Sequence, residues 1–215
     1  MSADAVGQRL TRATAVAAAL DIVTRDGVEA LSMRRLGREL GVDPMAVYHY
    51  IPSKQALFDE LVAAVWNELE LPGEGPWDQQ LRELGHAVRA LLTRYAHALP
   101  IIATRSGMGS GSLAVLDRGV AILTAAGMDA REAWQVLSVA SSWLIGHALA
   151  EVGRPPGGVA DVPEEVVEEA LSGSRAAVEF PHLAAAAEQG LLDWDEVFER
   201  GLDTLLDGVR SRLPA

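Results

Sequence analysis

The chain has 215 residues, of which 49% are hydrophobic, and it carries a formal net charge of −12 at pH 7. This length and apolar content suit one or two domains with a sizeable buried core. The absence of cysteine excludes disulfides and thiolate zinc sites. Asp4, Gln8 and Arg9 interrupt the N-terminal apolar residues, and no apolar stretch reaches the ~20 residues that cross a bilayer. We therefore expect a cytoplasmic protein that makes no membrane contact.

Three helices are predicted in the first quarter of the chain. The first spans about residues 11–25. The second begins after Ser32, whose hydroxyl can cap a helix, and ends at Gly41, because glycine readily takes the left-handed conformation of a tight turn. Asp43 then caps a third helix over residues 44–49, which has proline at its first position. This order predicts a helix-turn-helix, whose second helix enters the DNA major groove.

The third helix has one inward position and several outward ones. Val47 is expected to face the interior. The candidates to face a DNA groove are Met45, Ala46, Tyr48, His49 and Tyr50. Pro52 ends this segment and Ser53 caps the next helix. Lys54 then lies beside a helix N-terminus, which suits a phosphate contact.

Charge is distributed unevenly along the chain. Residues 1–54 hold seven Arg or Lys and six Asp or Glu, whereas the rest holds 11 basic and 24 acidic residues. Such an acidic body repels nucleic acid everywhere except at the N-terminal head, which limits non-specific binding and permits specific binding. The alternative is that Arg34, Arg35 and Arg38 only form a charged, solvent-exposed helix face and contact no DNA.

Residues 9–65 resemble the DNA-binding domain of the tetracycline repressor (TetR) family. The resemblance rests on landmarks in order and at family spacing, namely Gly27, residues 31–34, residues 40–42, Val47-Tyr48 and Ser53-Lys54. It implies that Arg34 contacts a base edge or a phosphate, that residues 44–46 approach the bases, and that Tyr48 and Lys54 bind backbone oxygens. Pro44 departs from the polar base-reading residue of the tetracycline-responsive branch, so the operator sequence does not carry over. The candidate DNA contacts are Ser32, Arg34, Arg35, Pro44, Met45, Ala46, Tyr48, His49, Tyr50 and Lys54.

The remaining chain reads as helix almost throughout, so the predicted fold class is all-α. The expected helices span residues 53–71, 77–98, 105–126, 129–152, 163–171 and 193–213, with turns at Pro100 and Gly127 and a proline-glycine connection at 154–158. The predicted organisation is a three-helix DNA-binding domain over residues 1–54, continuing into the connecting helix 53–71. A helical domain for effector binding and dimerisation follows over residues 72–215.

Helices 129–152 and 193–213 carry broad apolar surfaces. Periodicity alone leaves open that these surfaces only fill the protomer core. The family resemblance implies instead a homodimer, since family members pair these helices in a four-helix bundle. Two heads about 34–36 Å apart would then read a palindromic operator on double-stranded DNA.

The C-terminal part also resembles the tetracycline-repressor branch, through residues 101–105, 126–129, 138–146 and 198–208. This likeness implies a small-molecule pocket whose filling lowers DNA affinity. Ile101 and Leu84 stand where that branch has a magnesium-binding histidine and a drug-binding amide, so a mostly apolar or aromatic effector is expected in place of magnesium-tetracycline. The candidate ligand contacts are Leu84, Val88, Ile101, Thr104, Arg105, Trp134 and Ser138, with ordinary core packing as the alternative for each.

Catalysis has little support in the sequence. His86 and His97 share a helix face but lie eleven residues apart, about 16 Å, which one ion cannot bridge. No phosphate-binding glycine loop, nucleophile elbow or metal-ligand spacing is present, so we expect no catalytic residue, metal or cofactor. The expected function is a ligand-responsive repressor. The alternative is a DNA-tethered helical protein whose C-terminal domain has an enzymatic role, involving His97 or His147, or a protein-binding role.

Overall fold

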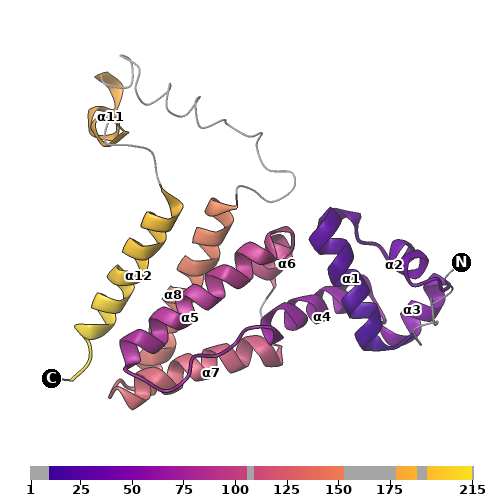
Figure 1. Ribbon diagram of the computed structural model, residues 1–215, viewed down its shortest axis with the longest axis horizontal. Helices are drawn as coiled ribbons and strands as arrows, with labels where there is room; N and C mark the ends of the chain where they lie inside the picture. The colour runs from indigo at the N-terminus through magenta and orange to yellow at the C-terminus, as the bar shows by residue number, and fades with distance from the viewer. Residues whose placement is uncertain (1–9, 106–108, 153–177, 188–192, 215) are drawn as a thin grey trace, which may run out of the picture.

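The computed structural model describes residues 10–105, 109–152, 178–187 and 193–214, and within these ranges every regular element is helical. The all-α fold expected from the sequence is thus confirmed. The α-helices are α1 (Arg12–Asp26), α2 (Met33–Glu39), α3 (Pro44–Tyr50), α4 (Lys54–Asn67), α5 (Trp77–Arg94), α6 (Leu99–Thr104), α7 (Ser110–Ala125), α8 (Ala130–Glu151), α11 (Pro181–Ala187) and α12 (Trp194–Arg210). Helices α1 to α3 form a head at one end of the molecule, and α4 leads from it into the helical body (Figure 1).

Local sequence explains where the head helices begin and end. Thr11 caps α1 through a reciprocal pair of hydrogen bonds with Thr14, and Gly27, with a φ of +83°, ends it. The head core consists of fully buried side chains from all three helices and from α4, including Ile22, Leu31, Leu36, Val47, Ile51, Leu57 and Leu61. Each such side chain contributes about 1.5–3 kcal/mol to the free energy of folding. This core holds α3 to the rest of the head from one side.

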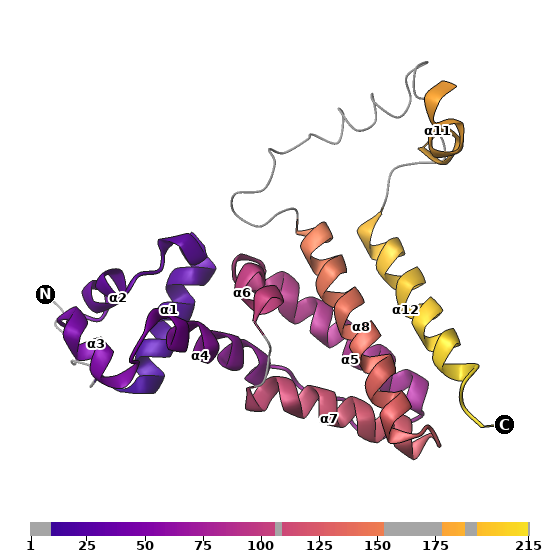
Figure 2. The same cartoon turned by 180° about the vertical axis from the view of Figure 1, so that it is seen from behind.

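Helix α4 connects the head to the body. It packs on α1 near its start and on α7 near its end (Figure 2). A Cβ at Gly111 of α7 would lie only 2.8 Å from the Asn67 backbone nitrogen, so the two helices cross almost backbone to backbone. The helix was expected to reach residue 71 but ends at Asn67, with Glu68 as its C-cap. Helices α4 and α7 are therefore in direct contact at this crossing.

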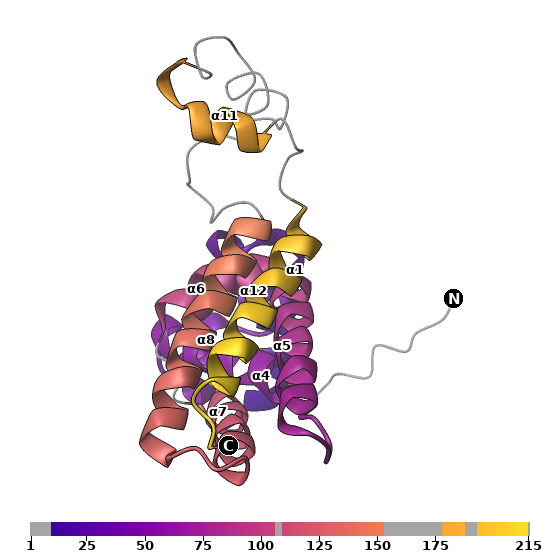
Figure 3. The ribbon, with the colours of Figure 1, turned by 90° about the vertical axis from the view of Figure 1, so that its left-hand side faces the viewer.

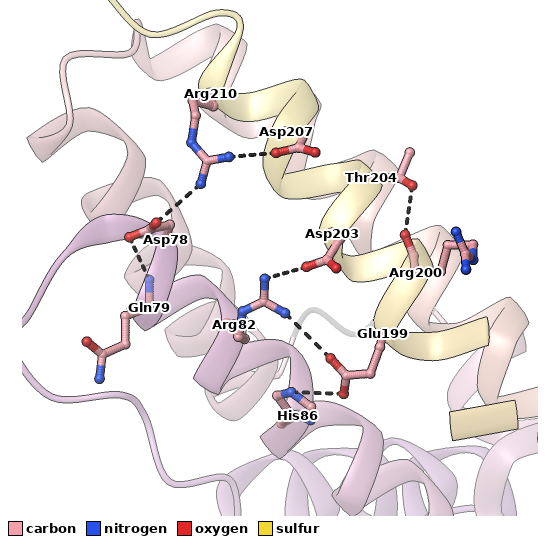
Figure 4. A network of polar contacts seen from close by, with 10 residues as sticks. All are labelled: Asp78, Gln79, Arg82, His86, Glu199, Arg200, Asp203, Thr204, Asp207 and Arg210. Carbon is pink, nitrogen blue, oxygen red and sulfur yellow. Dashed lines mark hydrogen bonds and ion pairs between the residues drawn. The ribbon is translucent and has the colours of Figure 1, made fainter. Parts of the chain in front are cut away.

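The body consists of α5, α6, α7, α8 and α12. Helix α12 packs against α5 and α8, and Figure 3 shows α8 and α12 side by side on one face of the body. Gly127, with a φ of +98°, forms the turn between α7 and α8. Along the α5–α12 contact, Arg82, His86 and Arg210 pair with carboxylates, as Figure 4 shows.

Four details of the body differ from the sequence prediction. The helix expected over residues 77–98 ends at Arg94, and a separate 3-10 helix spans Ala96–Ala98. Pro100 was expected in a turn but lies in the first turn of α6, where its missing N–H costs no hydrogen bond. Arg105 was expected to begin a helix but is extended, with a φ of −111° and a ψ of 131°, and the helix begins at Ser110. The last helix ends at Arg210, earlier than expected. The predicted segments 154–158 and 163–171 lie outside the described residues.

None of the described helices combines the length and the apolar composition that a bilayer span requires.

Candidate nucleic-acid interface and ligand cavity

Helix α3 presents one side to solvent while the other is anchored. Val47 and Ile51 are fully buried, whereas Met45 is 72% exposed and Tyr48 40% exposed. The Asp43 carboxylate accepts a hydrogen bond from the Met45 N–H at 2.8 Å, which caps the helix and fixes its first turn. A rigidly held helix with large exposed side chains matches the recognition helix of a helix-turn-helix.

The angle between α2 and α3 depends on a glycine inside α2. A Cβ at Gly37 would lie 3.0 Å from the Val42 carbonyl oxygen and 3.1 Å from the Pro44 nitrogen. Gly41, with a φ of +67°, makes the turn itself. The two helices therefore meet at a contact that a larger side chain at position 37 would push apart.

The other predicted DNA contacts differ in their solvent exposure and in the contacts that they make within the head. Arg34 and Lys54 are exposed, and the Lys54 ammonium lies 5.1 Å from the centre of the Phe58 ring. Arg35 instead pairs with Asp26 at the end of α1, so its guanidinium joins α2 to α1 within the head. Ser32 accepts a hydrogen bond from the Arg35 N–H at 3.2 Å and so caps α2. Of the remaining candidates, His49 and Tyr50 are exposed, and Pro44 and Ala46 are half-buried.

The body contains a partly open cavity of about 270 Å³. Its walls come from six helices and from Arg105 between α6 and α7. The lining residues are Trp66 of α4; Leu81, Leu84, Gly85 and Val88 of α5; Ile102 of α6; Arg105; Ser112, Val115 and Leu116 of α7; Val136, Leu137, Ala140, Ser141, Trp143, Leu144 and Ile145 of α8; and Leu202, Leu205, Leu206 and Val209 of α12. A cavity of this size and apolar character suits a small, largely hydrophobic molecule.

Three of the seven predicted ligand contacts line this cavity, namely Leu84, Val88 and Arg105. Ile101 does not, because the register of α6 turns Ile102 toward the cavity and Ile101 into the adjoining core. Thr104 is exposed, and its hydroxyl donates to the Pro100 carbonyl at 2.6 Å.

Trp134 and Ser138 also lie outside the cavity. Both are exposed, because they sit one residue away from the inward face of α8, which contains Ala133 and Leu137. Sequence reasoning missed the contributions of Trp66 and of α7 and α12. Their apolar periodicity showed that these helices bury one face but not that the faces meet around a space.

Arg105 lines the cavity and also contacts α4, the connecting helix. Its guanidinium donates to the Gln55 backbone carbonyl at 3.2 Å and also contacts the Gln55 side chain and the Asp59 carboxylate. It lies 5.1 Å from the centre of the Phe58 ring. All three partners are on α4, so a group that enters the cavity at Arg105 can act on the helix that carries the head.

The two histidines on which a catalytic body would depend are both engaged in the fold. His97 Nδ1 donates to the Thr24 carbonyl at 2.9 Å and so joins the body to α1. His147 is buried among Trp143, Trp194 and Phe198, and burial lowers the pKa of its imidazole. Among the described residues, no group of three or more His, Asp or Glu side chains is arranged to hold a metal ion.

An exposed recognition helix at one end and an apolar cavity coupled to its connecting helix define a class of protein, the DNA-binding regulators that respond to a small molecule. Two family models match the chain and identify its family within this class. The model for bacterial regulatory proteins of the tetR family matches residues 15–61, and the model for the tetracyclin repressor-like C-terminal domain matches residues 69–213.

Similar proteins agree with these matches. The HTH-type transcriptional repressor DrrR1 of Streptomyces coeruleorubidus is 26% identical over 214 residues, covering 93% of this chain and 77% of its own. An HTH-type transcriptional regulator of Saccharopolyspora erythraea is 30% identical over 204 residues, covering 94% and 85%. The structure of ActR from Streptomyces coelicolor in complex with actinorhodin superposes with a TM-score of 0.83 at 28% identity, covering 95% of this chain and 98% of ActR.

The chain belongs to the TetR family. It is a ligand-responsive, DNA-binding transcriptional regulator, and proteins of this family bind operator DNA and small molecules and form dimers.

Proposed function

We propose that the protein is a repressor that leaves a palindromic operator when a small, mostly apolar molecule fills the cavity. The observation that carries this proposal is the cavity of about 270 Å³ whose wall includes Arg105, a side chain bound to α4. DrrR1 is named a repressor, and ActR was solved with a bound small molecule, which supports both halves of the proposal. A regulator that binds the chromosome of a bacterium works in the cytoplasm, which we propose as its location.

The cavity wall favours an aromatic effector. Two indoles, from Trp66 and Trp143, offer flat apolar surface, and aliphatic side chains supply most of the remainder. The wall, as far as the structure describes it, contains no histidine, so it offers no imidazole to a ligand-borne metal ion. Within the predicted contact set we propose Leu84, Val88 and Arg105 as effector contacts.

Release follows from a preference of the effector for one of two states. A molecule that fits only when the Arg105 side chain has moved stabilises that state by its differential affinity. Because Arg105 contacts α4, the preferred state also changes the angle of the head. Two heads that no longer match the spacing of successive major grooves lose operator affinity.

We propose α8 and α12 as the dimer interface, and residues 1–54 with the connecting helix as the unit that moves relative to the body. Trp134 and Val139 of α8 are 50% and 60% exposed, and both are large apolar side chains that a partner would cover. The two helices lie side by side, as a four-helix bundle requires of each half (Figure 3).

The test begins with an operator selected from a random duplex library. Polycyclic aromatic compounds are screened for an increase in the melting temperature of the protein, and those that raise it are added to the operator complex while fluorescence anisotropy is recorded. We expect them to release the DNA. The matched control is Ala140→Phe, which fills the cavity and should abolish the melting shift. Compounds that shift melting in both proteins, or that leave operator affinity unchanged, would contradict the proposal.

A further inference from the structure

We propose that the cavity holds an anion subsite at Arg105, and that the effector is an aromatic acid whose carboxylate replaces Asp59 as the partner of this guanidinium. This inference rests on the proposed function, because it names the chemical class of the effector that acts there.

The first argument is the polarity of the wall. Among the described residues that line the cavity, Arg105 is the one with a formal charge. An arginine guanidinium carries a fixed positive charge in proteins. The Arg105 side chain is only 21% exposed before any ligand enters. A neutral apolar effector would remove more of its water and leave Gln55 and the exposed Asp59 as its only hydrogen-bonding partners among the described residues. Desolvation of a charge is costly unless the charge gains a well-placed partner.

The second argument is the weakness of the partner that Arg105 now has. The Asp59 carboxylate is 65% exposed, so water screens this ion pair strongly. A carboxylate inside the apolar cavity would meet the same guanidinium at lower effective dielectric, where charge-assisted and bidentate hydrogen bonds are stronger. The exchange of Asp59 for the effector carboxylate leaves Asp59 in water, where it needs no partner. The acid therefore gains affinity that a neutral molecule of the same shape does not.

The third argument concerns the consequence for α4. Arg105 binds Gln55 and Asp59, and it lies over Phe58. One side chain therefore contacts three residues on the same face of the connecting helix. Withdrawal of the guanidinium toward the cavity breaks these contacts together. The carboxylate is then the part of the effector that couples binding to release, whereas the rings supply most of the affinity. A neutral analogue should bind without releasing DNA to the same extent.

The test uses two probes of one shape, anthraquinone-2-carboxylate and the neutral anthraquinone-2-carboxamide. Binding to the full-length protein is measured by calorimetry and by quenching of tryptophan fluorescence, since Trp66 and Trp143 line the cavity. We expect the acid to bind at least tenfold more tightly than the amide and to release more of the operator at saturation. Arg105→Gln should remove this preference, so that the acid and the amide bind this variant with affinities within twofold of each other. Arg105→Lys, which keeps the charge, should retain part of it.

Two further variants complete the design. Asp59→Asn removes the competing carboxylate and should raise acid affinity severalfold without changing amide affinity. Arg94→Gln alters an arginine that is 68% exposed and does not line the cavity, and it should leave both affinities unchanged. Circular dichroism and the melting temperature establish that each variant is folded.

The outcomes separate the two proposals. If acid and amide bind equally and release the operator equally, the anion subsite is overturned and the proposed function stands. If the acid preference survives in Arg105→Gln, the subsite is also overturned. If neither probe binds, both this inference and an aromatic-ligand function of the cavity are overturned.

Discussion

Met45 and Tyr48 both extend from α3, but their chemistry assigns them different parts of an operator. Met45 lies in the first turn of the recognition helix and is the more exposed of the two. Its apolar side chain can contact base edges, for instance a thymine methyl group. The Tyr48 hydroxyl can donate to a phosphate oxygen, which positions the helix but carries no sequence information.

This assignment predicts different effects of two substitutions. Tyr48→Ala should weaken binding to the selected operator and to a scrambled duplex by similar factors. Met45→Ala should change the base preference at one position by about 1–3 kcal/mol, because a base contact carries discrimination. Anisotropy titrations on single-base operator variants distinguish the two results. A Tyr48→Ala protein that lost affinity for the operator alone would reverse the assignment.

The lowered pKa of His147 predicts that the stability of the protein depends on pH. Burial is the main cause that lowers its pKa below the ordinary value; Arg89 of α5 acts in the same direction and Glu151 of α8 opposes both. The α12 side chains that face it are Trp194 and Phe198, and Asp195 reaches the same cluster through Arg89. Because the unfolded imidazole binds a proton more readily than the folded one, the stability contributed by neutral His147 is present above about pH 6.5 and is lost as pH falls.

The expected result is a melting temperature that falls between pH 7.5 and pH 5.5. His147→Phe, which keeps an aromatic ring without a titrating group, should flatten part of this slope. His182→Phe alters an exposed histidine on α11 and should not change it. Identical slopes in the wild-type protein and in His147→Phe would show that other groups cause the pH dependence.

At the scale of elements, α12 is joined to α5 by two kinds of ion pair. Toward solvent, Arg82 pairs with Asp203 at 2.5 Å and with Glu199 at 3.5 Å, as Figure 4 shows, and all three side chains are at least 40% exposed. Deeper, Arg89 is 15% exposed and donates to Glu151 at 3.0 Å. Arg89 also contacts Asp195 and lies over the ring of Phe198, so it ties α5, α8 and α12 together.

The depth of each pair decides its energetic value. Arg82→Ala should lower the free energy of unfolding by less than about 1 kcal/mol, because exposed pairs are screened by water. Arg89→Ala should lower it by about 2–3 kcal/mol, because Glu151 is then left partly buried without its partner. Urea denaturation of both variants measures the difference. Equal losses would mean that burial does not separate the two positions.

At the scale of the whole molecule, operator binding by two heads requires that the protomers pair. Val139→Glu places a charge on the exposed apolar part of α8. If α8 and α12 form the dimer interface, this variant should sediment as a monomer and lose at least tenfold in operator affinity, since each head then binds alone. Ala90→Glu, at an exposed position of α5, is the matched control. A Val139→Glu protein that remained dimeric with full operator affinity would place the interface elsewhere.

Much of the head followed from local sequence. Ser32, Asp43 and Ser53 cap the helices that they were expected to cap, and Gly41 has the positive φ that its turn needs. These features depend on residues only a few positions apart, so short-range hydrogen bonding and backbone sterics are sufficient to predict them. The break between α6 and α7 was missed although the glycine- and serine-rich residues 106–112 follow Arg105, a composition typical of a loop.

The cavity could not be obtained in the same way. Apolar periodicity shows that a helix buries one face, but Ile101 and Ile102, or Trp134 and Leu137, differ only in rotation about a helix axis. That rotation is set by packing among α5, α7, α8 and α12, which are distant in the chain. The contact of Arg105 with Asp59 likewise joins residues 46 positions apart. Caps, turns and the family motif thus identified a DNA-binding regulator from short-range chemistry, whereas the position and charge of its ligand cavity depend on which side chains long-range packing brings together.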